Sequence, residues 1–139
     1  MSVLEEHAAY FFALSDTLIP AYGEMPAFSA ACTLADVAAC LAFRPDVADD
    51  FNRAIAIERS GDGRAAVVEL AADDPKAFSA LGLIVVSAYH IAPRVRALIG
   101  YPGQESRPIR PGEADADLRD GLLQPVIDRG RRYVPTPAG

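Results

Sequence analysis

Two histidines and three carboxylate pairs are the side chains best suited to proton transfer or metal binding in this sequence. The histidines, His7 and His90, lie far apart along the chain, and a metal site needs several ligands that converge. The carboxylates occur as sequence neighbours, at Glu5-Glu6, Asp49-Asp50 and Asp73-Asp74. Because consecutive helical residues do not face each other, no such pair forms an acid/base couple by itself. The third pair also suits the N-terminus of a helix.

One enzymatic hypothesis combines His90 and Tyr89 with a carboxylate, either Asp16 or Glu58. A free-standing helical enzyme of this kind requires these residues to meet in one cleft and to work without a partner. A histidine at the end of an apolar helix is more often a hydrogen-bonded core or boundary residue. The sequence Ser15-Asp16-Thr17 lacks the GxSxG pattern of an activated serine. We therefore predict no catalytic residue, no metal ligand and no cofactor in this chain.

The two cysteines, Cys32 and Cys40, lie eight residues apart and neither belongs to a CxxC pair. On a continuous helix this spacing corresponds to about 12 Å, which is too far for a disulfide. Free cysteines usually lie in apolar surroundings. We expect both thiols to be buried and unpaired.

A segment rich in proline, glycine and arginine, GYPGQESRPIRPG at residues 100–112, follows the most apolar part of the chain. We call residues 100–114 the strap and residues 130–139 the tail. Proline-rich backbone loses little conformational entropy when it lies across another surface, and tyrosine and arginine are common interface anchors. Composition alone leaves two interpretations open: a partner-binding segment, or an ordered loop packed on its own domain.

The elements that must carry these segments have helical periodicity. Apolar residues recur at spacings of three and four from Leu4 to Ile19, which predicts a first helix that ends at Pro20. The sequence PAYGEMPAF is a turn-rich connector. Thr33 and Asp36 suggest a capping box at the start of a second helix, and Pro45 suits the first position of a third. That third helix should place Val47, Phe51, Ala54, Ile55 and Glu58 on one side.

A short fourth helix is expected over residues 64–72, and Asp74-Pro75 predicts the start of a fifth. Because Leu83 and Val86 lie outside the main apolar stripe of the fifth helix, it should be buried nearly all round. A short helix over residues 94–99 should end at Gly100. The final helical stretch, residues 115–129, should be kinked or split by Pro125. Its inward residues should be Leu118, Leu122, Val126 and Ile127.

Length and composition favour one soluble helical domain. The chain has 139 residues, of which 51% are hydrophobic and 23% charged, as in ordinary globular domains. A net charge of -6 argues against a nucleic-acid-binding surface. The uncharged run 77–92 is short for a membrane span, and the N-terminus lacks the features of a signal peptide. We therefore predict an all-α fold over residues 1–139, with no membrane span.

Three motifs resemble one known family, the small subunit (subunit 3, or gamma) of gluconate 2-dehydrogenase-type enzymes. They are LSDTLIP at residues 14–20, GYPGQ at 100–104 and LLQPVIDRGRRYVPTP near the C-terminus. The first motif is similar to the family's Leu-Ala-Asp-x-Ile-Ile-Pro helix end. The resemblance spans most of the chain, and its specific part is confined to these three patches.

The resemblance implies a helical accessory subunit without its own cofactor. Its expected partner is a large FAD-dependent dehydrogenase of the glucose-methanol-choline type, and a cytochrome often accepts the electrons. Many members carry a twin-arginine export signal, which this sequence lacks, so we expect a cytoplasmic complex, or a periplasmic one if a signal was trimmed or the partner carries it. The residues expected to contact the flavoprotein are Tyr101, Pro102, Gly103, Gln104, Arg107, Pro108, Arg110, Arg131, Arg132 and Tyr133.

A third hypothesis is a homo-oligomeric protein that binds a small molecule between its apolar helices. It predicts a sizeable internal pocket. The accessory-subunit hypothesis instead predicts activity only in the presence of a flavoprotein.

Overall fold

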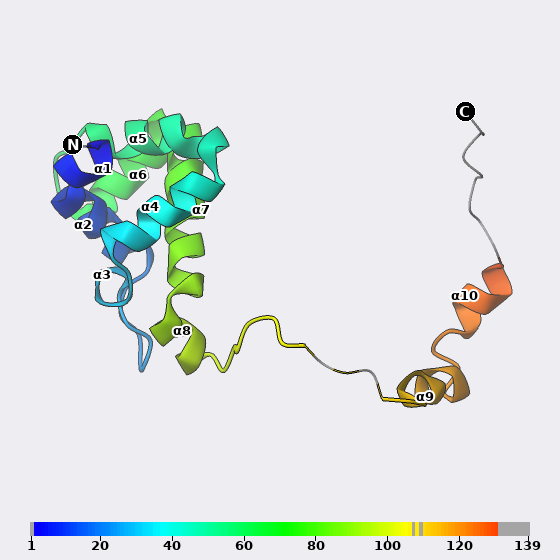
Figure 1. Cartoon of the computed structure of the whole chain (residues 1–139). Coiled ribbons are helices and arrows are strands. Elements are labelled where there is room, and N and C mark those ends of the chain that lie inside the picture. Colours follow the sequence, from blue (N-terminus) through cyan, green and yellow to red (C-terminus); the bar gives the residue numbers. More distant parts are fainter. Residues whose placement is uncertain (1, 107, 109, 131–139) are drawn as a thin grey trace. The chain divides into compact units, whose positions relative to one another are not determined.

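A computed structural model of the protein describes residues 2–106, 108 and 110–130. The regular elements in this part of the chain are helices and no strand is present (Figure 1), which confirms the predicted all-α fold. Contacts divide the chain into two compact units, Met1–Gly103 and Gln104–Gly139, called here the helical unit and the C-terminal unit. In the described residues, no helix combines the length and apolar character needed to cross a membrane.

The helical unit contains eight α-helices and one 3-10 helix among its described residues. They are α1 (Val3–Glu6), α2 (Ala8–Leu18), α3 (Phe28–Ala31), α4 (Leu34–Phe43), η1 (Pro45–Val47), α5 (Ala48–Ala56), α6 (Gly63–Asp73), α7 (Pro75–Ile91) and α8 (Pro93–Leu98). Helix α7 lies against α4, α5 and α6 and so forms the centre of the unit (Figure 1).

The N-terminal part differs from its prediction in two places. The expected first helix is divided at His7, whose φ of -106° and ψ of 24° interrupt the helix between α1 and α2. The turn-rich connector contains the short helix α3 and an isolated bridge between Tyr22 and Met25. The apolar periodicity alone did not reveal either feature. A single interrupted turn hardly changes the spacing of the apolar residues, so the residues before and after it still lie on the same side.

Side-chain caps define several helix starts as the sequence predicts. Thr33 and Asp36 form a complete capping box at α4, and the Asp74 carboxylate accepts a hydrogen bond from the Ala77 amide at 3.0 Å. Pro45 opens a helical segment as expected, but that segment is the 3-10 helix η1, which precedes α5. Because α5 ends at Ala56, the prediction that Glu58 belongs to that helix is wrong.

The core is built from aromatic and aliphatic side chains that pack together with the buried face of α7. Phe11, Phe28 and Phe51 are fully buried, and the Phe11 and Phe28 rings meet edge-on with centroids 5.6 Å apart. Such pairs stabilise a core beyond the burial of their area. The predicted stripe of α7 packs here, and its buried members are Leu81, Ile84, Val85, Ala88 and Tyr89.

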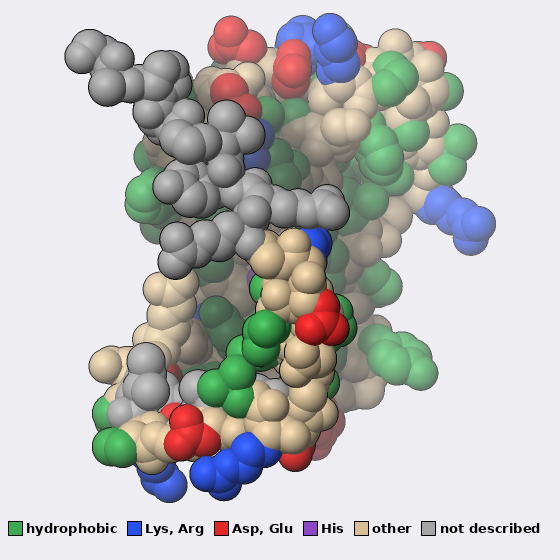
Figure 2. Space-filling view, turned by 90° about the vertical axis from the view of Figure 1, so that its right-hand side faces the viewer, with side chains coloured by type: hydrophobic (Ala, Val, Ile, Leu, Met, Phe, Trp, Pro, Cys, Tyr) green, Lys and Arg blue, Asp and Glu red, His purple; other side chains and the backbone are tan. Residues whose placement is uncertain are grey.

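The opposite face of α7 is not covered within the helical unit. Val86 exposes 49% of its surface, and Leu83 and Ile91 are exposed as well. The prediction that α7 is buried nearly all round is therefore wrong. Hydrophobic side chains reach the molecular surface in several places (Figure 2).

Both cysteines are buried and unpaired, as predicted. They do not lie on one helix, however, because Cys32 ends α3 and Cys40 lies in α4. Burial, together with the nearby Asp36 and Cys40, raises the pKa of the Cys32 thiol to about 11. These thiols stay protonated near neutral pH and are poor nucleophiles or metal ligands.

The C-terminal unit contains α9 (Glu113–Arg119) and α10 (Gln124–Arg129). The expected final helix is thus split in two, at a turn that includes Gly121 with φ of 71°, and Pro125 lies in the first turn of α10. The split follows because proline supplies no amide hydrogen to the preceding turn.

The apolar residues of this final stretch are not inward-facing. Leu118, Leu122, Val126 and Ile127 are all exposed, so that part of the prediction is wrong. The periodicity correctly indicated an apolar stripe, but the described residues of the C-terminal unit provide no core to cover it.

Candidate partner-binding segment

The strap begins in a tightly defined turn at the end of α8. Gly100 has φ of 66°, the left-handed conformation that favours glycine. Its amide donates to the Ala97 carbonyl, and the Tyr101 amide donates to the Arg96 carbonyl at 2.9 Å. These two bonds form a Schellman motif, which confirms Gly100 as the residue that ends the helix.

The side chain of Arg96 fastens the first residues of the strap to α8. Its guanidinium carbon lies over the Tyr101 ring, 5.6 Å from the centroid, a cation–π arrangement. Its Nη2 donates a hydrogen bond to the Pro102 carbonyl oxygen at 2.8 Å. Arg96 is half-buried and Tyr101 is exposed, so the arginine supports a tyrosine that remains accessible.

Position 103 favours glycine for two reasons. Its φ is 94°, which disfavours other residues. A Cβ atom built at this position would also collide with Nη2 of Arg96. The guanidinium therefore occupies the space that any larger residue at position 103 would need.

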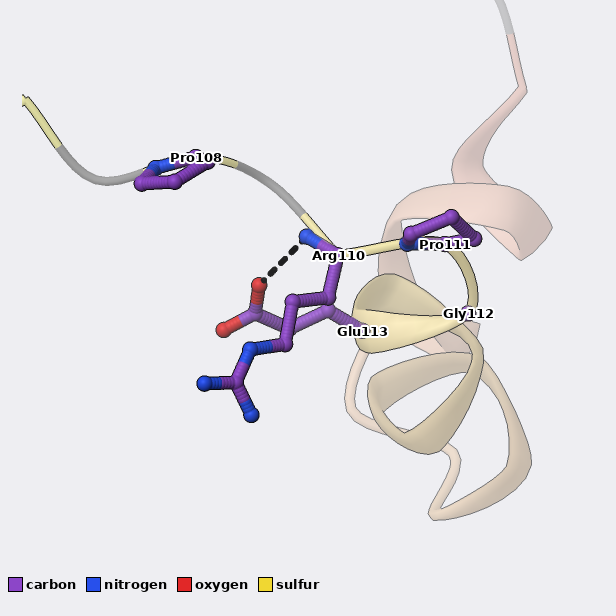
Figure 3. Close-up of a pocket in the computed structure, with 5 residues that line it drawn as sticks. All are labelled: Pro108, Arg110, Pro111, Gly112 and Glu113. Atoms are coloured by element: carbon purple, nitrogen blue, oxygen red, sulfur yellow. Dashed lines mark hydrogen bonds between the residues drawn. The ribbon is translucent and has the colours of Figure 1, made fainter.

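The far end of the strap is ordered by a second local turn. The Arg110 amide donates to a Glu113 carboxylate oxygen at 3.1 Å, and the Glu113 amide donates to the Arg110 carbonyl. Beside this turn lies an open hollow of about 470 Å³, which is lined by Pro108, Arg110, Pro111, Gly112 and Glu113. Figure 3 shows how these five residues lie around the turn. With one acid and one base in its lining, the hollow offers a recognition surface rather than a catalytic constellation.

Six of the ten predicted contact residues lie in the described part of the chain: Tyr101, Pro102, Gly103, Gln104, Pro108 and Arg110. All are exposed except the half-buried Gly103. Arg107, Arg131, Arg132 and Tyr133 lie outside the described residues. Tyr101, Pro102 and Gly103 meet around one arginine in the helical unit, while Pro108 and Arg110 line the hollow in the C-terminal unit.

Sequence reasoning missed two groups of residues with a role at this segment. Arg96 was not predicted, although the Schellman motif indicates the contact. In this motif the side chain at position C3, here Arg96, often lies against the side chain at C″, here Tyr101. The second group is the exposed aliphatic residues of α9, of α10 and of the turn between them. Four of these residues were predicted to face inward, and Leu123, which exposes 42% of its surface, was not singled out.

The residues of the enzymatic hypothesis have separate partners. The buried Tyr89 hydroxyl donates to the Pro26 carbonyl at 2.7 Å, and burial raises its pKa. His90 is exposed, with Nδ1 2.9 Å from the Val86 carbonyl oxygen. This pairing fits the hydrogen bond expected for His90, at a surface position instead of in the core.

The two candidate carboxylates have other partners. Asp16 accepts hydrogen bonds from the amide and hydroxyl of Ser29, both at 2.7 Å. Glu58 lies 4.0 Å from Nδ1 of His7. These contacts give the carboxylates structural roles. Across the described residues, no group of three or more histidines, cysteines or carboxylates is arranged to hold a metal ion.

Two shallow hollows follow the exposed side of α7. One, of about 360 Å³, lies near Val47 and Leu83, and another, of about 210 Å³, is lined by residues that include Phe43, Ile84 and Ile91. Both are mainly apolar and partly open to solvent. They are surface features, unlike the enclosed pocket that the small-molecule hypothesis predicts.

Comparison with known proteins adds no relative. No protein-family model, no curated protein and no solved structure matches this chain. The functional interpretation therefore depends on the residues and their contacts, together with the motif resemblance.

Proposed function

We propose that this chain is a non-catalytic helical subunit that binds and stabilises a larger protein through its strap and C-terminal helices. The proposed partner is an FAD-dependent sugar or alcohol dehydrogenase of the glucose-methanol-choline type. In this complex the partner holds FAD and carries out the oxidation. The helical unit supplies a folded base for the binding segment.

The observation that carries the proposal is an aliphatic stripe of the C-terminal unit that no described residue of this unit covers. It is formed by Leu118, Leu122, Leu123, Val126 and Ile127, which expose between 42% and 68% of their surfaces. Exposed apolar residues concentrated in so short a stretch are typical of an interaction site. Short amphipathic helices commonly place such a stripe in an apolar groove of another protein.

The two ordered ends of the strap support the same proposal. One end is held by Arg96 and the other by the Arg110–Glu113 turn. A segment with a local turn at each end and a proline-restricted backbone loses less conformational entropy on binding than a flexible one. The strap therefore suits an extended contact with a protein surface.

The class of the partner comes from the motif resemblance. LSDTLIP, GYPGQ and the C-terminal motif are similar to small subunits of flavin-dependent dehydrogenases. GYPGQ falls in the strap, and the first part of the C-terminal motif, residues 122–130, lies in and beside α10. The described residues of both motifs are exposed except the half-buried Gly103. This coincidence favours a flavoprotein over an unrelated partner.

The proposal predicts a neighbouring gene that encodes an FAD-binding chain, and co-expression with that chain tests it. We expect a yellow complex with dye-linked dehydrogenase activity only when both chains are present. The double substitution L122S/V126S should prevent co-elution, because it removes apolar contacts from the stripe. R119S/D128S, which changes one charge of each sign on the same two helices, should co-elute nearly as the wild type does.

Replacing residues 104–111 with a glycine-serine linker of equal length tests the strap separately. We expect co-elution to be lost while the helical unit keeps its circular dichroism spectrum and melting temperature. Retained binding after both the strap replacement and L122S/V126S would contradict the proposal. Flavin-independent activity of the isolated chain would instead support an enzyme, and a stable homo-oligomer would support self-association.

A further inference from the structure

We infer that Arg96 is a positioning residue that presents Tyr101 to the protein partner. The inference rests on the proposed function, since it concerns how the partner-binding segment leaves the helical unit. Arg96 lies outside the strap and precedes the residues that the sequence motifs single out. Its role follows from three contacts that one side chain makes with three consecutive strap residues.

The contacts fix both the backbone and the side chain at the start of the strap. Nη2 of Arg96 holds the Pro102 carbonyl at 2.8 Å, and the guanidinium lies over the Tyr101 ring. Next to it, Gly103 leaves the space that Nη2 occupies. A planar guanidinium can stack on a ring and donate in its own plane at once, whereas a lysine ammonium cannot.

The arrangement leaves Tyr101 available although it is held. Arg96 covers one face of the ring, yet the side chain still exposes 53% of its surface. Tyrosine is an efficient interface anchor because only two side-chain torsions must be fixed on binding. Arg96 restricts these torsions before the partner arrives, so less conformational entropy is lost on binding.

The neighbouring Arg94 provides a matched control for substitutions of Arg96. Arg94 lies in the same short helix and is exposed, and its side chain makes no hydrogen bond or ion pair with the described residues. A substitution at Arg94 removes the same charge without releasing the strap. Any difference between the two positions therefore reports on positioning rather than on net charge.

The test measures binding of the full-length chain to the flavoprotein encoded beside it. We expect R96M to weaken binding by about fivefold to tenfold through lost preorganisation, and R94M to change it by less than about twofold. The affinity of R96K should lie between those of R96M and the wild type. The lysine keeps a cation near the Tyr101 ring but lacks the planar guanidinium that also donates to the Pro102 carbonyl. The thermal unfolding of the helical unit should be the same in all variants.

A double-mutant cycle with Y101A separates positioning from direct contact. If Arg96 acts through Tyr101, R96M should weaken binding much less in the Y101A background than in the wild type. Additive losses would overturn the inference, since they would mean that Arg96 touches the partner itself. If R96M fails to fold, G103A provides a second variant, because its new Cβ displaces the guanidinium while Arg96 stays present.

The outcomes distinguish this inference from the proposed function. If the strap replacement abolishes binding while R96M and R94M behave alike, the inference is wrong and the proposed function stands. If the wild-type chain does not bind the flavoprotein, both are wrong. Nuclear magnetic resonance gives a readout independent of the partner: ring-current shifts of the Arg96 side-chain protons should disappear in Y101A.

Discussion

The helical unit and the C-terminal unit contain similar apolar residues but use them in opposite ways. Phe51 of α5 is fully buried, whereas Leu122, beside α10, exposes 68% of its surface. The helical unit packs α4, α5 and α6 against α7, while α9 and α10 lack side-chain caps at their N-termini. Chains shorter than about 40 residues rarely bury enough surface to be stable alone. The comparison teaches that an apolar stripe specifies a core only when enough neighbouring helices are available.

The largest expected difference concerns truncation of one apolar side chain in each unit. F51A should lower the free energy of unfolding of the helical unit by about 3–5 kcal/mol, because it leaves a cavity in a packed core. V126A should change it by less than about 0.5 kcal/mol. Urea denaturation followed by circular dichroism measures both. A loss above 1 kcal/mol in V126A would show that the two units are thermodynamically coupled.

A smaller effect is expected from the cap of α4. T33A should destabilise the helical unit by about 1 kcal/mol, because the Asp36 amide then loses the acceptor that the Thr33 hydroxyl provides. T33S keeps that hydroxyl and serves as the matched control. Equal melting temperatures for T33A and T33S would show that the cap contributes nothing measurable. This prediction sharpens the comparison because neither helix of the C-terminal unit has such a cap.

The last expected effect is confined to alkaline pH and concerns the stability of the helical unit. Burial raises the folded-state pKa of Cys32 to about 11, from an ordinary value of 9.0. As the pH rises, the thiol of the unfolded chain therefore loses its proton first. The contribution of Cys32 to the free energy of unfolding is complete below pH 9.0 and declines as the pH rises towards 11. The free energy of unfolding of C32A should fall less over this range than that of the wild type. Parallel curves would show that Cys32 is not buried in solution.

Local sequence was sufficient to predict much of this architecture. The Thr33–Asp36 box, Asp74-Pro75 and Gly100 identify helix ends through interactions that involve residues three to five apart. The same kind of local pattern predicted the buried stripe of α7 and the break caused by Pro125. These features are local because hydrogen bonds at helix ends, and the geometry of proline, depend on nearby residues alone.

The exposure of each apolar surface depended on tertiary structure. Periodicity shows that Leu83 and Val126 lie on apolar faces, but only the set of packed neighbours determines whether a face is covered. The pairing of Asp16 with Ser29 and of Glu58 with His7 likewise follows from the arrangement of the helices.

The sequence by itself therefore determined the all-α class, the helix boundaries set by caps and prolines, and the position of the strap. Tertiary structure decided which apolar stripe became the core and which remained exposed. It also decided that Arg96 meets Tyr101, Pro102 and Gly103 at the start of the strap. The physical reason is that hydrophobic burial is a property of the whole assembly of helices, whereas helix capping is a property of a single turn.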